Sequence, residues 1–107
     1  MTENQEHAIW KMDQMIQVQE GSVVSRTLIN EKTGTVTLFA FDANQGLSEH
    51  AAPYDALAHL IEGKLTITLG GSPYNLEPGD MLLMPANVPH ALKAETRVKF
   101  LLTMIRA

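Results

Sequence analysis

The sequence contains no cysteine, and this absence excludes several classes of chemistry at once. Disulfide frameworks, thiolate zinc sites, cysteine nucleophiles and iron–sulfur clusters all require a thiol. Any metal ligands must therefore come from carboxylates and from histidine, of which the chain has only four. No serine stands in the G-x-S-x-G pattern of a nucleophile elbow, so serine hydrolase chemistry has little support either.

Long apolar runs and basic clusters are also lacking. No run approaches the roughly 20 apolar residues that span a membrane, and the N-terminus has neither the basic start nor the apolar core of a secretory signal. The eight Lys and Arg residues are scattered through a chain of net charge −4, so the basic patch that nucleic acid requires is missing. We therefore expect a cytoplasmic protein without a nucleic-acid or membrane partner.

Helical periodicity is nearly absent, and aromatic residues make up only 6% of the chain. What recurs is a short β-branched run followed by Gly, Pro or Asn, which is typical of an all-β sandwich or barrel. The 107 residues fit one domain, with an N-terminal arm or short helix over 1–16 and a β-barrel over 17–107. Strands are predicted at 22–29, 35–41, 57–61, 64–69, 81–84 and 98–105, with a short edge strand at 73–76.

Glycine-containing turns separate these strands. Gly34 ends a turn between the first two strands, and Gly63 lies between 57–61 and 64–69. Because glycine adopts the positive φ of a tight turn, both positions predict hairpins. We therefore expect the strands to follow one another as a meander.

Two of the predicted strands are apolar on both faces. Residues 35–41 alternate threonine and phenylalanine with Val36, Leu38 and Ala40, and residues 98–105 are similar. One face can fill a barrel, but an exposed apolar strand is an aggregation hazard unless something covers it. This pattern predicts a homodimer.

Two stretches resemble the conserved motifs of the cupin superfamily: GLSEHAAPYDALAHLIEG at 46–63 and GDMLLMPANVPH at 79–90. In the second, Gly79, Pro85 and His90 hold the family positions, while Asn87 replaces a glycine. Asparagine tolerates left-handed backbone, so we expect this turn to keep its geometry. The resemblance implies a double-stranded β-helix, the jelly-roll barrel of the cupins.

The resemblance also implies a metal site of which half is missing. Metal-binding cupins take three ligands from the first motif and one from the second; here His50 and His90 remain, and Ala52 and Ala56 hold the other two positions. Two imidazoles alone make a weak set of metal ligands, because divalent ions usually take three or four protein ligands. Iron, manganese, nickel or zinc is therefore expected to bind weakly or substoichiometrically.

Other side chains near the motifs are candidates to complete the site. Asp55 precedes Ala56 by one residue, and a one-residue shift along a strand turns a side chain to the opposite face. His59 is also an odd number of residues from Ala56, which would turn it to the opposite face. The proline before Tyr54 makes the alternation of faces across this segment unreliable. The candidate ligand-binding residues are His50, Tyr54, His59, Asn87 and His90. The candidate catalytic residues are His50, Asp55 and His90.

Three functions follow, and whether the chain is an enzyme stays open. The one we rank first is a small monocupin that binds a small polar or carboxylated molecule in its barrel, in a regulatory role without chemistry of its own. The second is a metal-dependent enzyme of the dioxygenase or isomerase type that uses His50 and His90. The third is a metal-free acid–base isomerase or epimerase of sugars, in which Asp55 orients a histidine.

Overall fold

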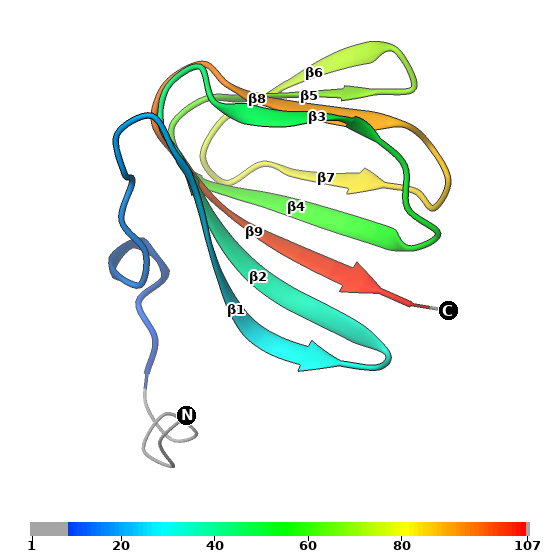
Figure 1. Ribbon diagram of the computed structural model, residues 1–107, viewed down its shortest axis with the longest axis horizontal. Helices are drawn as coiled ribbons and strands as arrows, with labels where there is room; N and C mark the ends of the chain where they lie inside the picture. Colours follow the sequence, from blue (N-terminus) through cyan, green and yellow to red (C-terminus); the bar gives the residue numbers. More distant parts are fainter. Residues whose placement is uncertain (1–8, 107) are drawn as a thin grey trace.

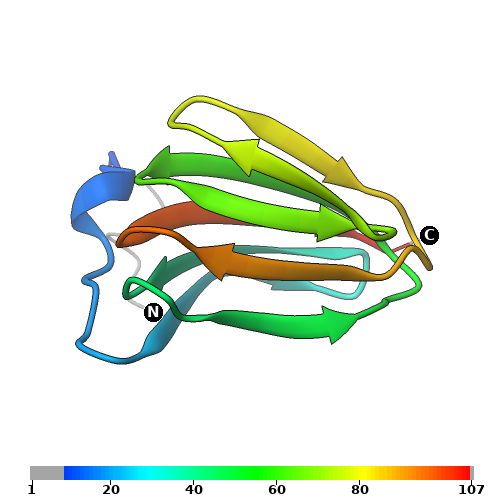
Figure 2. The ribbon, with the colours of Figure 1, turned by 90° about the horizontal axis from the view of Figure 1, so that it is seen from above.

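The computed structural model describes residues 9–106, which form two antiparallel β-sheets that enclose a core (Figures 1 and 2). One sheet has the strand order β1-β2-β9-β4-β7 and the other β3-β8-β5-β6. This architecture confirms the all-β jelly-roll expectation. Within the described range the strands are β1 (Val23–Glu31), β2 (Gly34–Phe41), β3 (Gly46–His50), β4 (Asp55–Glu62), β5 (Leu65–Leu69), β6 (Ser72–Leu76), β7 (Met81–Met84), β8 (His90–Ala94) and β9 (Val98–Ile105).

The strand order is not the meander expected from the turns. The hairpin at Gly34 is confirmed, because β1 and β2 pair directly. The hairpin expected at Gly63 is wrong, because β4 and β5 lie in different sheets. Gly63 does have a positive φ of 85°, but it carries the chain from one sheet to the other. A β-carbon there would collide with the carbonyl oxygen of Arg97, so only glycine fits this crossing.

Two of the observed strands, β3 and β8, were not expected from the sequence. Both are five residues long and pair with each other. Most residues of β3 are exposed, so its sequence carries little of the apolar alternation by which strands are recognised. These two strands matter most for function, since His50 ends β3 and His90 begins β8.

The core lies between the two sheets and is closed by aromatic stacking. The ring of Phe100 lies 5.1 Å from those of both Phe39 and Phe41, stacked on the first and edge-on to the second. From β4, the side chains of Ala58 and Leu60 face this core and are fully buried. These contacts fill one end of the barrel with side chains and leave the end near the histidines less filled.

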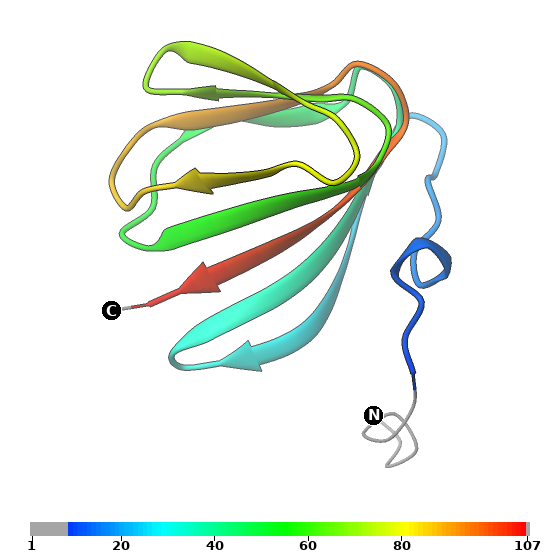
Figure 3. The same cartoon turned by 180° about the vertical axis from the view of Figure 1, so that it is seen from behind.

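The N-terminal segment packs on the outer face of the five-stranded sheet, against residues of β1, β2, β9 and β4 (Figures 1 and 3). It contains the only helical turn of residues 9–106, η2 (Met12–Gln14), which is far too short to cross a membrane. Ile16 is buried against this face. Two cations hold the segment: Lys99 Nζ donates to the carbonyl oxygen of Asp13 at 2.6 Å, and an Arg26 guanidinium nitrogen donates to that of Met15 at 2.9 Å. Residues 1–8 of the expected arm lie outside the described residues.

Candidate ligand-binding site

His50 and His90 face each other directly across the β3–β8 ladder. The register pairs the two residues, and their Nε2 atoms lie 3.0 Å apart. The rings meet edge to face, with centroids 4.3 Å apart and an interplanar angle of 69°. His90 is buried, with 8% of its surface exposed, whereas His50 is exposed. Two histidines forty positions apart in the sequence thus contact each other.

Backbone carbonyls fix which nitrogen of each ring carries a proton. Nδ1 of His50 lies 2.8 Å from the carbonyl oxygen of Ser48, and Nδ1 of His90 lies 3.2 Å from that of Val88. A carbonyl oxygen can only accept, so both Nδ1 atoms must donate. Two neutral rings would then face each other with lone pairs on both Nε2 atoms, which repel at 3.0 Å. A shared proton or a metal ion between the two Nε2 atoms would relieve this repulsion.

The histidines line a small cavity of about 180 Å³ inside the barrel. Its size suits a small molecule rather than a larger ligand, since drug-sized pockets span roughly 300 to 1,000 Å³. The polar groups of its wall are the two imidazoles and Tyr54, and the rest of the lining is apolar. The lining residues are Leu47, His50, Ala52, Tyr54, Ala56, Met84, His90, Leu92, Leu102 and Met104.

Ala52 and Ala56 both contribute methyl groups to this wall. These are the positions where the resemblance to cupins would place two further metal ligands. Among residues 9–106, no cluster of three or more His, Asp or Glu side chains could hold a metal ion. The pair alone has suitable spacing, because two nitrogens about 2.1 Å from one ion and at right angles to each other lie about 3.0 Å apart. The residues present therefore offer two ligands and do not fit a tightly held resident metal.

The other candidate residues from the sequence lie elsewhere, apart from Tyr54. Asp55 and His59 alternate along β4 with Ala56 and Ala58, which face the core, so both point to the outer face of the sheet. His59 is paired there with Met81 and Leu101 rather than with His50 or His90. The structure thus places neither Asp55 nor His59 at the cavity. Nothing brings Asp55 into position to orient either cavity histidine, as the acid–base hypothesis requires.

Asp55 and Asn87 instead connect the two loops that carry the histidines. The Asp55 carboxylate accepts a hydrogen bond from the Ala86 backbone N–H at 2.9 Å. The Asn87 N–H donates to the carbonyl oxygen of Ala52 at 2.7 Å. Asn87 has a φ of 68°, which confirms that the turn keeps left-handed geometry without glycine. Both residues therefore hold the rim of the cavity without lining it.

Sequence reasoning missed one residue at this rim, Arg106. Its guanidinium carbon lies 5.4 Å from the centre of the Tyr54 ring, within range of a cation–π interaction. Arg106 also donates to the carbonyl oxygen of Glu31 at 2.9 Å. No local pattern marks Arg106, because it meets Tyr54 only through the folding of the sheet.

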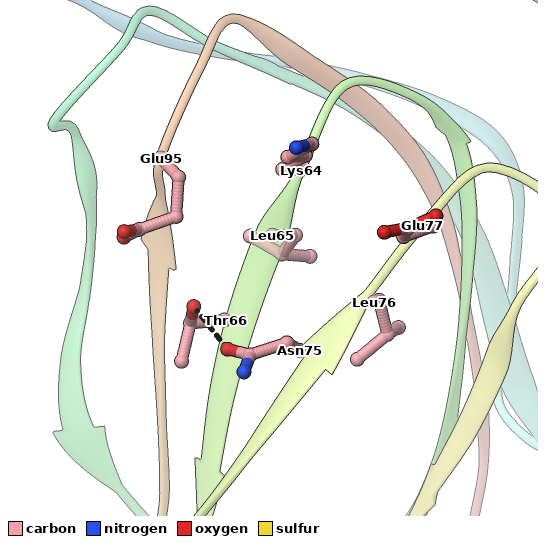
Figure 4. Close-up of a pocket in the computed structure, with 7 residues that line it drawn as sticks. All are labelled: Lys64, Leu65, Thr66, Asn75, Leu76, Glu77 and Glu95. Carbon is pink, nitrogen blue, oxygen red and sulfur yellow. Dashed lines mark hydrogen bonds between the residues drawn. The ribbon is translucent and has the colours of Figure 1, made fainter.

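A second, more open hollow of about 280 Å³ lies on β5 and β6, away from the histidines (Figure 4). Thr66 and Asn75 project into it and bond to each other, with Thr66 Oγ1 donating to Asn75 Oδ1 at 2.9 Å. Lys64, Glu77 and Glu95 lie at its edge (Figure 4). Although this hollow is larger, its side chains do not converge on one point, and we base the site on the histidine cavity.

Residues 37–105 match the family model of the cupin domain. The chain is a cupin. Among solved structures, a conserved protein of unknown function from Streptococcus pyogenes matches this cupin with a TM-score of 0.90 and 28% identity, over 94% of this chain and 88% of that one. A cupin 2 conserved barrel domain protein from Leptotrichia buccalis matches with a TM-score of 0.87 and 32% identity. That match covers 91% of this cupin but 47% of the other protein, so this chain spans about half its length.

Enzymes also occur among the structural relatives of this cupin. Salicylate 1,2-dioxygenase from Pseudoaminobacter salicylatoxidans matches with a TM-score of 0.73 and 20% identity, over 78% of this chain and 26% of that one. At this identity the likeness shows a shared fold alone. Comparison with curated proteins found no match. The function must therefore be argued from the cavity itself.

Proposed function

We propose that this cupin binds a small carboxylated molecule in the histidine cavity and performs no chemistry on it. The observation that carries the proposal is the His50–His90 contact in a cavity whose other lining residues are apolar, apart from Tyr54. A proton shared between the two Nε2 atoms gives the pair one net positive charge. A carboxylate beside the rings would neutralise this charge, which is costly to leave unpaired in apolar surroundings.

The remainder of the ligand would be apolar and short. Besides the histidines, the cavity wall includes the apolar side chains of Met84, Leu102 and Met104. Methionine side chains adapt to ligands of irregular shape. Tyr54 adds one hydroxyl at the rim, where it could bond a second polar group of the ligand. A monocarboxylic acid with a small aliphatic or aromatic body has this combination of groups.

Isothermal titration calorimetry with matched ligands tests the proposal. We expect small carboxylic acids to bind and the corresponding primary amides to bind at least about tenfold more weakly, because the amide lacks the negative charge. Replacing His50 or His90 by Ala should abolish binding. His59→Ala is the matched control, since this histidine lies on the other face of β4, and it should bind as the wild type does. Equal binding by acids and amides, or unchanged binding by His50→Ala and His90→Ala, would contradict the proposal.

A second candidate function, a metal-dependent enzyme, is favoured by one observation. The 3.0 Å separation of the Nε2 atoms suits two adjacent ligands of one ion, and both rings donate Nδ1–H to carbonyl oxygens, as metal-bound histidines usually do. His50 and His90 would hold the ion, which would supply Lewis-acid chemistry.

Elemental analysis separates the two functions. Because Ala52 and Ala56 supply no ligands, we expect protein purified without added metal to contain well under one equivalent of iron, manganese, nickel or zinc. Near-stoichiometric metal that is lost in both His50→Ala and His90→Ala would favour the enzyme instead. Metal that is retained in both variants would be bound at another site. The presence of metal would then support neither function.

A further inference from the structure

Two methionines flank Ala56 across the five-stranded sheet. The register pairs Ala56 of β4 with Met84 of β7 on one side and with Met104 of β9 on the other. Residues that pair in this way point to the same face, with β-carbons about 5 Å apart. All three line the histidine cavity. Ala56 holds the position where the resemblance to cupins would place a carboxylate ligand, so two thioethers flank the ligand that is missing.

The methionines and the histidines lie on different sheets at the same end of the barrel. Met84 is the last residue of β7 and His50 the last of β3, whereas His90 is the first of β8. Ala56 is the second residue of β4, and Met104 is the second to last of β9. These strand ends gather at the right of Figure 1. Imidazole nitrogens and thioether sulfurs therefore line one space of about 180 Å³.

The two imidazoles are already in the state that binds a metal. Both Nδ1 atoms donate to backbone carbonyl oxygens, which leaves lone pairs on Nε2 atoms that lie 3.0 Å apart. A tetrahedral ion with bonds of about 2.1 Å holds two nitrogens about 3.4 Å apart. His50 is exposed, so its ring can move by this small difference. The pair thus supplies two ligands without a change of tautomer.

The chemistry of the lining decides which metal it suits. Neutral imidazole binds several transition metals, but thioether sulfur selects the soft ion Cu(I). No Asp or Glu lines the cavity, so the wall has no anion to balance the two positive charges of a divalent ion. An uncompensated charge in apolar surroundings is costly, and a monovalent ion brings half as much. The methionines thus favour Cu(I) at a cavity that does not fit a resident divalent metal.

We propose that the cavity binds one Cu(I) ion. Nε2 of His50 and Nε2 of His90 supply two ligands from one sheet. The thioether sulfurs of Met84 and Met104 supply the others from the opposite sheet. This site does not depend on the proposed acid ligand, but it is compatible with that ligand, because Cu(I) between the rings carries the same charge as a shared proton.

Competition with bathocuproine disulfonate, a chromogenic chelator of Cu(I), tests the site in the full chain under anaerobic, reducing conditions. We expect the wild type to take up one equivalent. Met84→Leu and Met104→Leu should each bind Cu(I) at least about tenfold more weakly, since leucine keeps the volume of methionine but removes the sulfur. Met81→Leu is the matched control on β7, because Met81 is 61% exposed and does not line the cavity. Its affinity should equal that of the wild type.

Zinc affinity shows whether the leucine variants remove a ligand or only disturb the cavity. Because Zn²⁺ binds through nitrogen, oxygen and thiolate ligands rather than thioethers, Met84→Leu should weaken Cu(I) binding more than zinc binding. His50→Ala should weaken both. Equal losses for the two metals in Met84→Leu would overturn the proposal, as would a wild type that takes no Cu(I) from the chelator.

X-ray absorption spectroscopy of the Cu(I)-loaded protein identifies the ligands directly. We expect sulfur as well as nitrogen neighbours around copper, and the sulfur should disappear in the double variant Met84→Leu, Met104→Leu. A shell of nitrogen alone in the wild type would overturn the proposal. Calorimetry with carboxylic acids on the copper-free protein decides the proposed function separately, so failure of one leaves the other standing.

Discussion

The two faces of β4 differ in burial and in the kind of side chain they carry, although their residues alternate along one strand. Ala56, Ala58 and Leu60 point inward and are buried, and Ala56 lines the histidine cavity. Asp55 and His59 point outward, where Asp55 holds a turn and His59 lies among apolar neighbours. The face that lines the histidine cavity thus carries alanines, and the ionisable groups lie on the face away from that cavity. The alternation of side chains between the two faces of the strand, rather than residue type, decides which side chains can contribute to the site.

The largest effect is expected from shortening one leucine on each face of β4. Leu60→Ala should lower the free energy of unfolding by about 2 to 5 kcal/mol, because Leu60 is fully buried and its loss leaves a cavity. Leu57→Ala should cost about 1 kcal/mol or less in the monomer, since Leu57 is already 37% exposed. Urea unfolding at low protein concentration measures both. Equal losses would show that the two faces are not distinguished by burial.

A carboxylate placed on each face in turn would sharpen the comparison. Ala56→Glu should add a third ligand to His50 and His90 and raise zinc affinity by more than the roughly 10- to 100-fold that an outer hydrogen-bond partner contributes. Leu57→Glu adds the same group to the outer face and should leave zinc affinity unchanged. Competition against a chromogenic chelator measures both affinities. A gain in Leu57→Glu, or none in Ala56→Glu, would contradict the assignment of faces.

The smallest effect is expected at the barrel end remote from the histidines. Hydrogen bonds from the backbone N–H groups of Gly21 and Ala43, together with Arg97, hold the pKa of Asp42 below its ordinary value of 3.8. The pKa of Asp42 is lower in the folded chain than in the unfolded chain. The resulting stabilisation is therefore fully present above the unfolded pKa and is lost as the pH falls through the folded pKa.

Asp42→Asn should therefore weaken the loss of stability on acidification below about pH 4 without affecting the cavity. Urea unfolding of both proteins between about pH 6 and about pH 3 measures this difference. Identical acid profiles would contradict the role of Asp42, and a change in ligand binding at neutral pH would show that the two barrel ends are coupled.

Much of the fold could be predicted because most strands carry a clear apolar signal. The strands Met81–Met84 and Val98–Ile105 have the bounds expected from sequence. The order of the strands could not be predicted, because a glycine between two strand signals is compatible with a hairpin or with a crossing between sheets. Gly34 follows the turn of a hairpin, and Gly63 carries the chain between sheets. A β-carbon would meet a carbonyl oxygen at both positions, and only Gly63 has a positive φ.

The candidate site could be predicted only at its two histidines. The motifs identified His50 and His90, but not that their rings touch or that backbone carbonyls fix their tautomers. The face to which the side chains of Asp55 and His59 point depends on where β4 begins. The preceding proline prevents that start from being located in the sequence. The contact between Arg106 and Tyr54 joins residues 52 positions apart, beyond the reach of any local pattern.

Lys99 offers a chemical measure of how firmly the N-terminal segment is held. Its amine is bonded to the Asp13 carbonyl oxygen, and the residue is only 7% exposed. Lys93, on the other sheet, is exposed. An amine must reach solvent to be acylated, so Lys99 should react only when the segment lifts from the sheet. The ratio of the acylation rates of Lys99 and Lys93 therefore reports how often the covered end of this face opens.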